Sequence, residues 1–462
     1  MKLSLVKNVQ FVVLTLCLCV GSIPLFSADV DEDPGDFQEE LNNRDYQALR
    51  DFLQSKVKVD VAERCSTLTI SGDVRTEWRN LHESCCGNEL RGSKSQETVG
   101  KAIPHNDFDI EFNLRFDYVF EKAWAVAQIR YDNSAGVDDN NHPCGPVGVD
   151  DGKTCSGGCP AKAKKCSGDP GGYHGSGRCG DLCLRRAFIG YNFLADGYSR
   201  FDVELGRRGN LYNVFTSNVE FLSRLDGIFA KYETVASGYA EFYIEAAGFV
   251  VDEKVNHFAW ATELGALDIA DSGFDLIYSY IDWQQRGKNR CSVKNPIGFR
   301  FTVSQVLTQY NVECEYLKCD WFNGKGLFYA AFLCNSAARD LILEDGFNCG
   351  KQNIGWYAGV LIGKVREKGD WSVEIQYQVV QAQAIPDEDV SGIGRGNVLD
   401  ESFTTCSRRG NTNFKGWRFE ALYAITDNLS LDTILEWSKA YDSKIGGRHK
   451  YSKFELETIY AF

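Results

Sequence analysis

The sequence predicts an all-β chain that closes into a membrane-spanning, antiparallel, up-and-down barrel of about sixteen strands. Three observations predict this fold class: an N-terminal export segment, a two-residue hydrophobic alternation that recurs along the chain, and connections that alternate between short and long. The composition agrees with strands and turns, because the 462 residues include 44 Gly, only 9 Pro and 13% aromatic residues.

The N-terminus has the pattern of a secretory signal peptide. Lys2 and Lys7 form a basic start, Val9–Val20 is almost wholly apolar, and small residues follow up to Ala28. We expect removal of residues 1–28, with cleavage after Ser22 as the alternative. A membrane anchor is disfavoured because the apolar run is short for a transmembrane helix. Losing two lysines moves the formal charge from −14 to −16, which argues against nucleic acid as a partner.

Residues 29–64 are predicted to be a periplasmic N-terminal helical segment. Between Asp33 and Lys58, apolar residues recur with a partial helical period among many charged residues. This segment is either an oligomerisation arm or a loosely docked surface helix.

From Thr67 the hydrophobic period changes to two, and residues 65–462 are predicted to form the barrel. In Asp107–Tyr118, polar and apolar residues alternate without an error. A pleated strand sends neighbouring side chains to opposite faces, so one face can meet lipid and the other water. Open sheet edges are not tolerated in lipid, so the spanning form is a closed barrel. The predicted strands are 67–79, 107–119, 123–132, 185–194, 200–208, 226–234, 239–250, 256–266, 273–283, 310–318, 326–334, 354–364, 370–381, 414–425, 428–439 and 451–462.

The connections between these strands alternate in length. Short ones such as Phe120–Lys122 and Ala195–Ser199 contain turn pairs, and they lie between longer ones such as 133–184 and 284–309. Short turns at one end and long loops at the other are typical of outer-membrane barrels. Ile297–Val303 also alternates, and a strand there raises the count to eighteen.

Short segments along the chain carry a resemblance to a known family. They are Leu68–Arg75, Leu205–Arg208, Leu225–Gly227, Gly369–Trp371 with Tyr377, and Ile459–Phe462. They resemble porin-type outer-membrane proteins of chlamydia-like bacteria, a group similar to carbohydrate-selective porins, over about residues 45–462. The resemblance implies an outer-membrane pore, trimeric or monomeric, whose third long loop folds into the lumen. The closing Tyr460 and Phe462 resemble the aromatic assembly signal of such barrels.

Charged residues on the predicted inner faces are the candidates for the pore lining. Charges inside a channel set ion preference, although they can also merely brace the wall through cross-strand pairs. The basic candidates are Arg75, Arg115, Arg130, Arg186, Arg208 and Arg418. The acidic residues mixed with them are Asp73, Asp109, Glu111, Glu204, Glu374, Glu420 and Glu436.

The third long loop, residues 209–225, is the candidate for a constriction. It contains Tyr212, Phe215, Glu220 and Phe221. Folded inward, it would narrow the lumen and place an acid opposite a basic wall, and its aromatic rings could stack on sugars. The alternative is an extracellular loop that packs on a neighbouring subunit.

The second long loop, residues 133–184, is rich in cysteine and glycine. Its cysteines are Cys144, Cys155, Cys159, Cys166, Cys179 and Cys183. We expect disulfides here rather than a metal site, because zinc modules use tight paired spacings and exported cysteines are usually oxidised. Two of the 17 cysteines lie in the signal. The odd remainder leaves one cysteine free or linked to another envelope protein.

Together these features predict a passive pore for small hydrophilic solutes, sugars or anions, surrounded by outer-membrane lipid. The six histidines stand in no recognisable catalytic motif, so neither an enzyme nor a cofactor is expected. Three alternatives stay open: a structural or adhesive surface barrel linked by disulfides, a soluble secreted all-β protein, and an outer-membrane enzyme.

Overall fold

The computed structural model describes residues 58–60, 66–91, 105–133, 181–208, 214–219, 225–252, 257–284, 301–313, 324–342, 346–386 and 412–462. The predicted signal peptide 1–28 lies outside these residues, as do the predicted helix 33–58, apart from Lys58, and nearly all of the cysteine-rich loop 133–184. Those predictions therefore stand as made.

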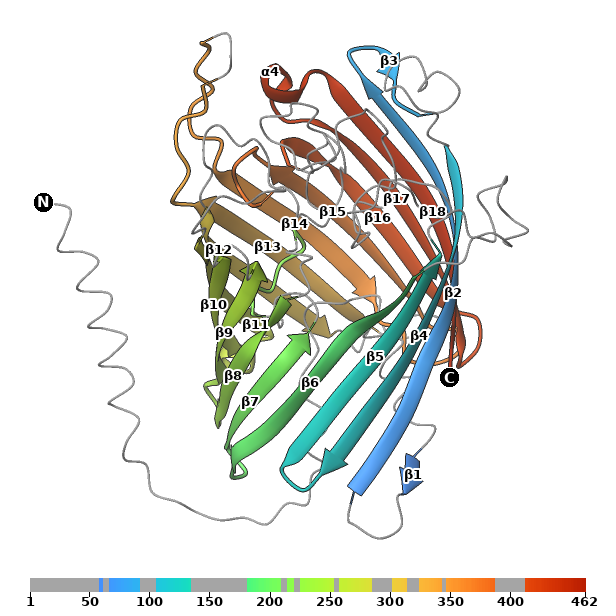
Figure 1. The fold of residues 1–462 in the computed structure, drawn as a ribbon, viewed down its shortest axis with the longest axis vertical. Coiled ribbons are helices and arrows are strands. Elements are labelled where there is room, and N and C mark those ends of the chain that lie inside the picture. Colours follow the sequence, from blue (N-terminus) through green and yellow to red (C-terminus); the bar gives the residue numbers. More distant parts are fainter. Residues whose placement is uncertain are drawn as a thin grey trace, which may run out of the picture.

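Sixteen long antiparallel strands form one closed barrel (Figure 1). They are β2 (Ser66–Cys85), β4 (Asn106–Phe120), β5 (Ala123–Asn133), β6 (Asp181–Ala195), β7 (Ser199–Arg208), β8 (Leu225–Ala236), β9 (Ala240–Asp252), β10 (His257–Leu267), β11 (Phe274–Gln284), β12 (Phe301–Glu313), β13 (Lys325–Asn335), β14 (Ile354–Gly363), β15 (Trp371–Val380), β16 (Phe414–Ala424), β17 (Leu429–Ala440) and β18 (His449–Ala461). Each pairs with the next, and β18 pairs with β2, so the long strands leave no open edge. The predicted fold class and the count of sixteen are confirmed.

Four small elements decorate this barrel in the described part of the chain. The short strands β1 (Lys58–Asp60) and β3 (Asn88–Glu89) both pair with β2. The helices are the 3₁₀ turn η3 (Ile269–Asp271) and α4 (Ser443–Gly446). Asp442 caps α4 by accepting a hydrogen bond from the backbone N–H of Lys444 at 2.9 Å. None of the helices described is long and apolar enough to cross a membrane.

One predicted strand was wrong. The sequence favoured 310–318 and treated 284–309 as a loop, whereas β12 spans Phe301–Glu313. The segment Ile297–Val303, considered for an extra strand, contains the beginning of β12, so the count stays at sixteen. The strand was misplaced because both of its faces are mixed: Val303 and Gln305 are buried on one face, and Ser304 and Val306 lie on the other. Simple alternation of polar and apolar residues is therefore weak there.

The strands expose apolar side chains on the outer surface of the barrel and enclose polar ones, which is the reverse of the arrangement in a soluble protein. In β4, Phe108 and Ile110 are 50% and 39% exposed, while Asp109 and Asn113, on the other face, are 7% and 1% exposed. The apolar side chains point away from the barrel axis, and the polar ones point into it. This is the arrangement of a barrel whose outer surface meets lipid.

Large aromatic side chains form a row on the outer face near the end with the long loops. Trp356, Tyr377 and Trp417 follow one another on β14, β15 and β16, with ring centroids 5.5 and 4.7 Å apart. Trp437 on β17 lies directly opposite Trp417 in the register. We call these four residues the aromatic row. Such aromatic girdles mark the membrane–water interface of transmembrane barrels.

The barrel closes where the C-terminal end of β18 meets β2. The backbone groups of Gly72 and Phe462 exchange two hydrogen bonds of 3.0 and 2.9 Å. The ring of Phe462 stacks on Phe112 with centroids 6.3 Å apart. A Cβ on Gly72 would lie 2.6 Å from this ring, so the glycine makes room for the aromatic residue that closes the seam.

Candidate pore lining

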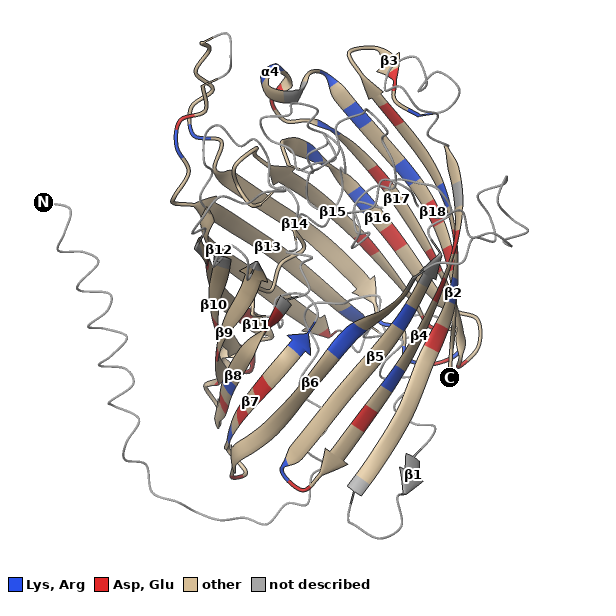
Figure 2. Ribbon diagram, viewed as in Figure 1, with Lys and Arg blue, Asp and Glu red and all other residues tan. Residues whose placement is uncertain are grey.

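Charged side chains gather on one part of the inner surface. Figure 2 shows Lys, Arg, Asp and Glu along β2, β4–β7 and β16–β18, whereas β12–β14 are almost free of them. We call the inner faces of the first set of strands the charged wall. It contains all six predicted arginines, which lie on β2, β4, β5, β6, β7 and β16.

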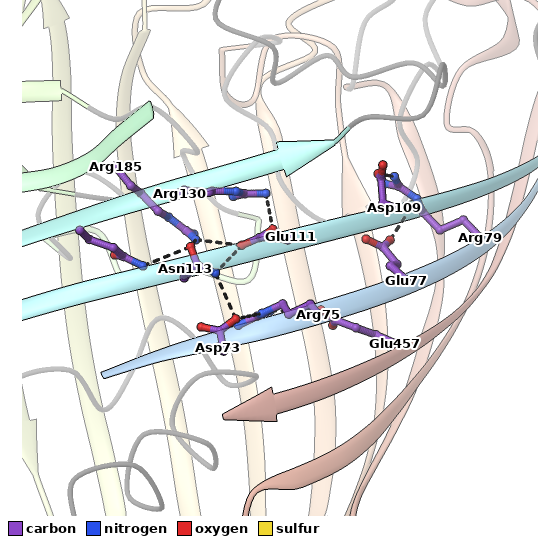
Figure 3. Close-up of polar contacts among 11 residues, drawn as sticks. Asp73, Arg75, Glu77, Arg79, Asp109, Glu111, Asn113, Arg130, Arg185 and Glu457 are labelled. Atoms are coloured by element: carbon purple, nitrogen blue, oxygen red, sulfur yellow. Dashed lines mark hydrogen bonds and ion pairs between the residues drawn. The ribbon is translucent and has the colours of Figure 1, made fainter. Parts of the chain in front are cut away.

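Arg75 stands at the centre of a buried network on this wall (Figure 3). Its Nε donates to Asp73 Oδ1 at 2.6 Å, and its Nη1 lies 3.3 Å from Glu457 Oε1 on β18. Asn113 on β4 donates to the same Asp73 oxygen at 3.1 Å. The network thus joins β18, β2 and β4 across the seam of the barrel.

Glu111 holds a second network on the neighbouring strands. It forms an ion pair with Arg130 on β5 and lies 3.5 Å from Arg185 on β6. Arg185 is the extra residue of a β-bulge, because the pairing of β5 and β6 shifts between Gln128–Arg186 and Ile129–Leu184. A bulge re-aims a side chain, and here it brings Arg185 to the inner face beside the predicted Arg186.

A third group lies nearer the long loops. Arg79 pairs with Glu77 at 3.0 Å and with Asp109 on β4. On β18, Lys453 lies 2.7 Å from Glu455 and 3.5 Å from Glu436 on β17. With these contacts, ion pairs between acidic and basic residues are present on every strand from β17 through β18 and β2 to β4.

Acidic partners are also present for three further predicted arginines, Arg115, Arg208 and Arg418. Arg115 pairs with Asp117 at 2.7 Å, and Arg418 pairs with Glu420 at 2.7 Å. Arg208 is 6% exposed and lies 2.8 Å from Glu204, which also accepts a hydrogen bond from Trp124 Nε1 at 3.1 Å. The charges of this wall are therefore largely balanced within the protein.

The inner faces of β10–β15 are different, and we call them the apolar wall. Its buried side chains include Ile277, Ile281, Val303, Leu307, Leu333 and Tyr357. Three buried acids interrupt it: Glu263, Asp275 and Glu374. Neutral groups donate hydrogen bonds to each of them: Ser279 donates to Glu263, Asn311 to Asp275, and Tyr329 to Glu374.

Residues 214–219 of the third long loop lie against the apolar wall. Val214, Phe215 and Val219 are buried in the same hydrophobic cluster as the residues of that wall. The backbone N–H and the hydroxyl of Thr216 donate to Glu263 at 2.6 and 2.7 Å. Gln305 on β12 donates to the Thr216 carbonyl, and Gln378 on β15 donates to the Asn218 carbonyl at 3.2 Å. We call residues 214–219 the inner segment.

The sequence missed several residues of these sites. Of the loop candidates, Phe215 is in the inner segment, whereas Tyr212, Glu220 and Phe221 lie outside the described residues. The anchor Glu263 was not singled out, although its strand places it on one face with Ala259, Ala261 and Gly265. A lone acid among small and apolar residues is a usable signal, because a buried carboxylate needs hydrogen-bond donors. Of the candidate disulfide cysteines, only Cys183 is described, and it lies in β6.

Comparisons with known proteins give structural likeness at low identity. No family model matches the chain, and no curated protein matches it. The match to OprB of Pseudomonas putida spans 86% of this chain and 94% of OprB, with 9% sequence identity and a TM-score of 0.48. The match to OmpF of Salmonella typhi, in complex with daunomycin, spans 88% of this chain and all of OmpF, with 12% sequence identity and a TM-score of 0.43. The match to a mutant of the Rh. blastica porin spans 86% of this chain and all of the porin, with 9% sequence identity and a TM-score of 0.41. The fold assignment therefore rests on the strand pairing and exposure of this chain itself.

Proposed function

We propose that this protein is a pore of the outer membrane that lets small hydrophilic solutes diffuse passively. The observation that carries the proposal is the opposite polarity of the two barrel surfaces, with lipid-compatible side chains outside and ion-paired charges inside. Sixteen strands are in the range in which barrels enclose an aqueous channel. The resemblance to chlamydia-type porins and to carbohydrate-selective porins supports the same assignment.

The inner segment is proposed to narrow this channel. Its hydrogen bonds to β10, β12 and β15 hold it against the apolar wall. The free cross-section is then bordered mainly by the charged wall. A solute that carries hydroxyl groups or an anionic charge meets arginines such as Arg75 and Arg130 there, so sugars and small anions are the proposed cargo.

The remaining parts of the proposal concern export and assembly. We propose that residues 1–28 direct export, that the long loops face the cell exterior, and that cysteines of the loop 133–184 form disulfides. A homotrimer is the proposed assembly, and a disulfide to another envelope protein uses the odd cysteine. Gels with and without reductant test the disulfides, because linked species collapse only when reductant is present.

Reconstitution in a planar bilayer tests the pore. The purified protein, whose folded state is verified by heat-modifiable mobility on a gel, is expected to give stepwise current increases. The same preparation after heat denaturation is the matched control and should give none. Folded protein that inserts into the bilayer but remains silent would contradict the proposal. Addition of maltose-type sugars then shows whether sugars block the current.

A further inference from the structure

Three lysines lie in register on the outer face of neighbouring strands. Lys415 on β16 is directly opposite Lys439 on β17, and Lys439 is directly opposite Lys450 on β18. The residues beside them in each strand, such as Gly416, Ser438 and Tyr451, are buried on the inner face. The three lysines therefore point outward, and we call them the lysine row.

The lysine row lies just beyond the aromatic row, towards the long loops. Lys415 is two residues from Trp417, and Lys439 is two residues from Trp437, on the same face of each strand. Because the aromatic row marks the membrane interface, the lysines are at the level of the lipid headgroups. Long lysine side chains reach into this zone while their stems cover apolar surface.

Like charges directly opposite one another on a sheet are unfavourable, with Cβ atoms only about 5 Å apart. In the described part of the chain, no carboxylate forms an ion pair with any member of the lysine row. Among the described residues, Lys415 Nζ lies 5.1 Å from the ring centroid of Tyr441. The repulsion within the row is thus not relieved by the described acids of the protein.

Another outward-facing basic residue at the same end of the barrel has an acidic partner. Arg207 on β7 forms two hydrogen bonds with Asp226 on β8, at 2.7 and 2.9 Å. This pair neutralises itself, whereas the lysine row concentrates positive charge on three adjacent strands. Figure 2 shows basic segments towards the loop end of these strands.

We propose that the lysine row binds the phosphate groups of an anionic lipid in the outer leaflet. The inference rests on the proposed membrane location but not on conduction through the pore. A phosphorylated headgroup supplies several strong acceptors at the height of the lysines, and its acyl chains lie along the exposed side chains of β16–β18, including Trp417 and Trp437. One multiply charged headgroup can contact more than one lysine, which removes the repulsion within the row.

The test uses the folded barrel in detergent and native mass spectrometry with bis-phosphorylated lipid A as the probe. The wild type is expected to keep bound lipid A and to keep little of the same lipid without its phosphates. The variant K415Q/K439Q/K450Q should lose about 100-fold in affinity, since each lysine near an anionic surface contributes roughly fivefold. K325Q, a lysine at the short-turn end that pairs with Glu313 at 3.5 Å, is the matched control and should bind as the wild type does.

Other outcomes overturn the proposal. Equal binding of lipid A by the triple variant, or equal binding of the phosphate-free lipid by the wild type, contradicts it. Displacement of lipid A by millimolar inorganic phosphate would show a site for a free anion instead. If the triple variant does not fold, K439Q alone should still show about a fivefold loss. Stepwise conductance of the same sample decides the pore proposal separately.

Discussion

The charged wall and the apolar wall use the same strand geometry for different purposes. Both present apolar side chains outward, so the lipid-facing pattern does not distinguish them. Inside, the charged wall is held by ladders such as Asp73–Arg75–Glu457, whereas the apolar wall buries residues such as Ile281 and Leu307. The composition of the inner face of a barrel strand therefore depends on what lies against it. The apolar wall packs against the inner segment, whereas the charged wall faces the interior of the barrel.

The apolar wall also explains why its few acids matter. Glu263 is 1% exposed and accepts hydrogen bonds from Thr216, Ser279 and Tyr243. A carboxylate in such surroundings is tolerated because these three residues donate hydrogen bonds to it. It acts as the fixed point to which the loop backbone is attached.

Removing this anchor should have the largest effect. In E263Q the side chain keeps its size but presents an amide nitrogen to donors, so at least one hydrogen bond of Thr216 is lost. We expect a destabilisation of roughly 3 kcal/mol and a larger, noisier single-channel current, because the inner segment leaves the apolar wall. Single-channel recording and urea unfolding measure both effects.

D275N is the matched control for that variant. Asp275 is a buried acid on the same wall, but it bonds to Asn311 and to the backbone of Asp268 rather than to the inner segment. Its current should equal that of the wild type. An unchanged current in E263Q would show that the inner segment does not narrow the channel.

Neutralising the centre of the charged wall should have an intermediate effect. R75Q leaves the buried carboxylates of Asp73 and Glu457 without their shared guanidinium, which costs about 1–3 kcal/mol. The lumen then gains net negative charge and should become more cation-selective, as measured by the reversal potential in a KCl gradient. The double variant D73N/R75Q restores the balance and should move the potential back. A potential that does not move in R75Q would mean that ions pass elsewhere.

Weakening the outer side of the seam between β18 and β2 should have the smallest effect on the finished channel. F462A removes the ring that stacks on Phe112 but leaves the backbone bonds to Gly72 and the ion pair between β18 and β2. We expect a loss of about 1–2 kcal/mol for a partly exposed ring and a lower yield of heat-modifiable barrel, with unchanged unit conductance. Y423A, an exposed aromatic residue away from the seam, should assemble normally. Equal yields of the two variants would contradict a special role for Phe462.

The sequence predicted fifteen of the sixteen strands close to their observed positions because the outer faces of these strands are mostly apolar. β12 was misplaced because Ser304 and Thr308 interrupt its outer face while Val303 and Leu307 make its inner face apolar. The pattern of that strand depends on the inner segment, which is far from it in sequence. The alternation of polar and apolar residues within one strand cannot predict a contact with a segment that is distant in the sequence.

The pore lining was predicted in kind but not in detail. Arg75 and Glu111 follow directly from strand parity, since every second residue shares a face. Arg185 could not be assigned in this way, because a bulge breaks the parity within β6. Thr216 was missed because it lies in a loop, where no periodicity indicates which side chains bind the wall.

The ion pair between Arg75 and Glu457 has a consequence for the order of events during biogenesis. It joins residues that are 382 positions apart along the chain, and both edges that it links are unpaired until β18 reaches β2. Contacts of such sequence separation form slowly. Until that contact forms, the edge of β2 can pair with strands of other chains, so we expect aggregation to compete with closure of the barrel.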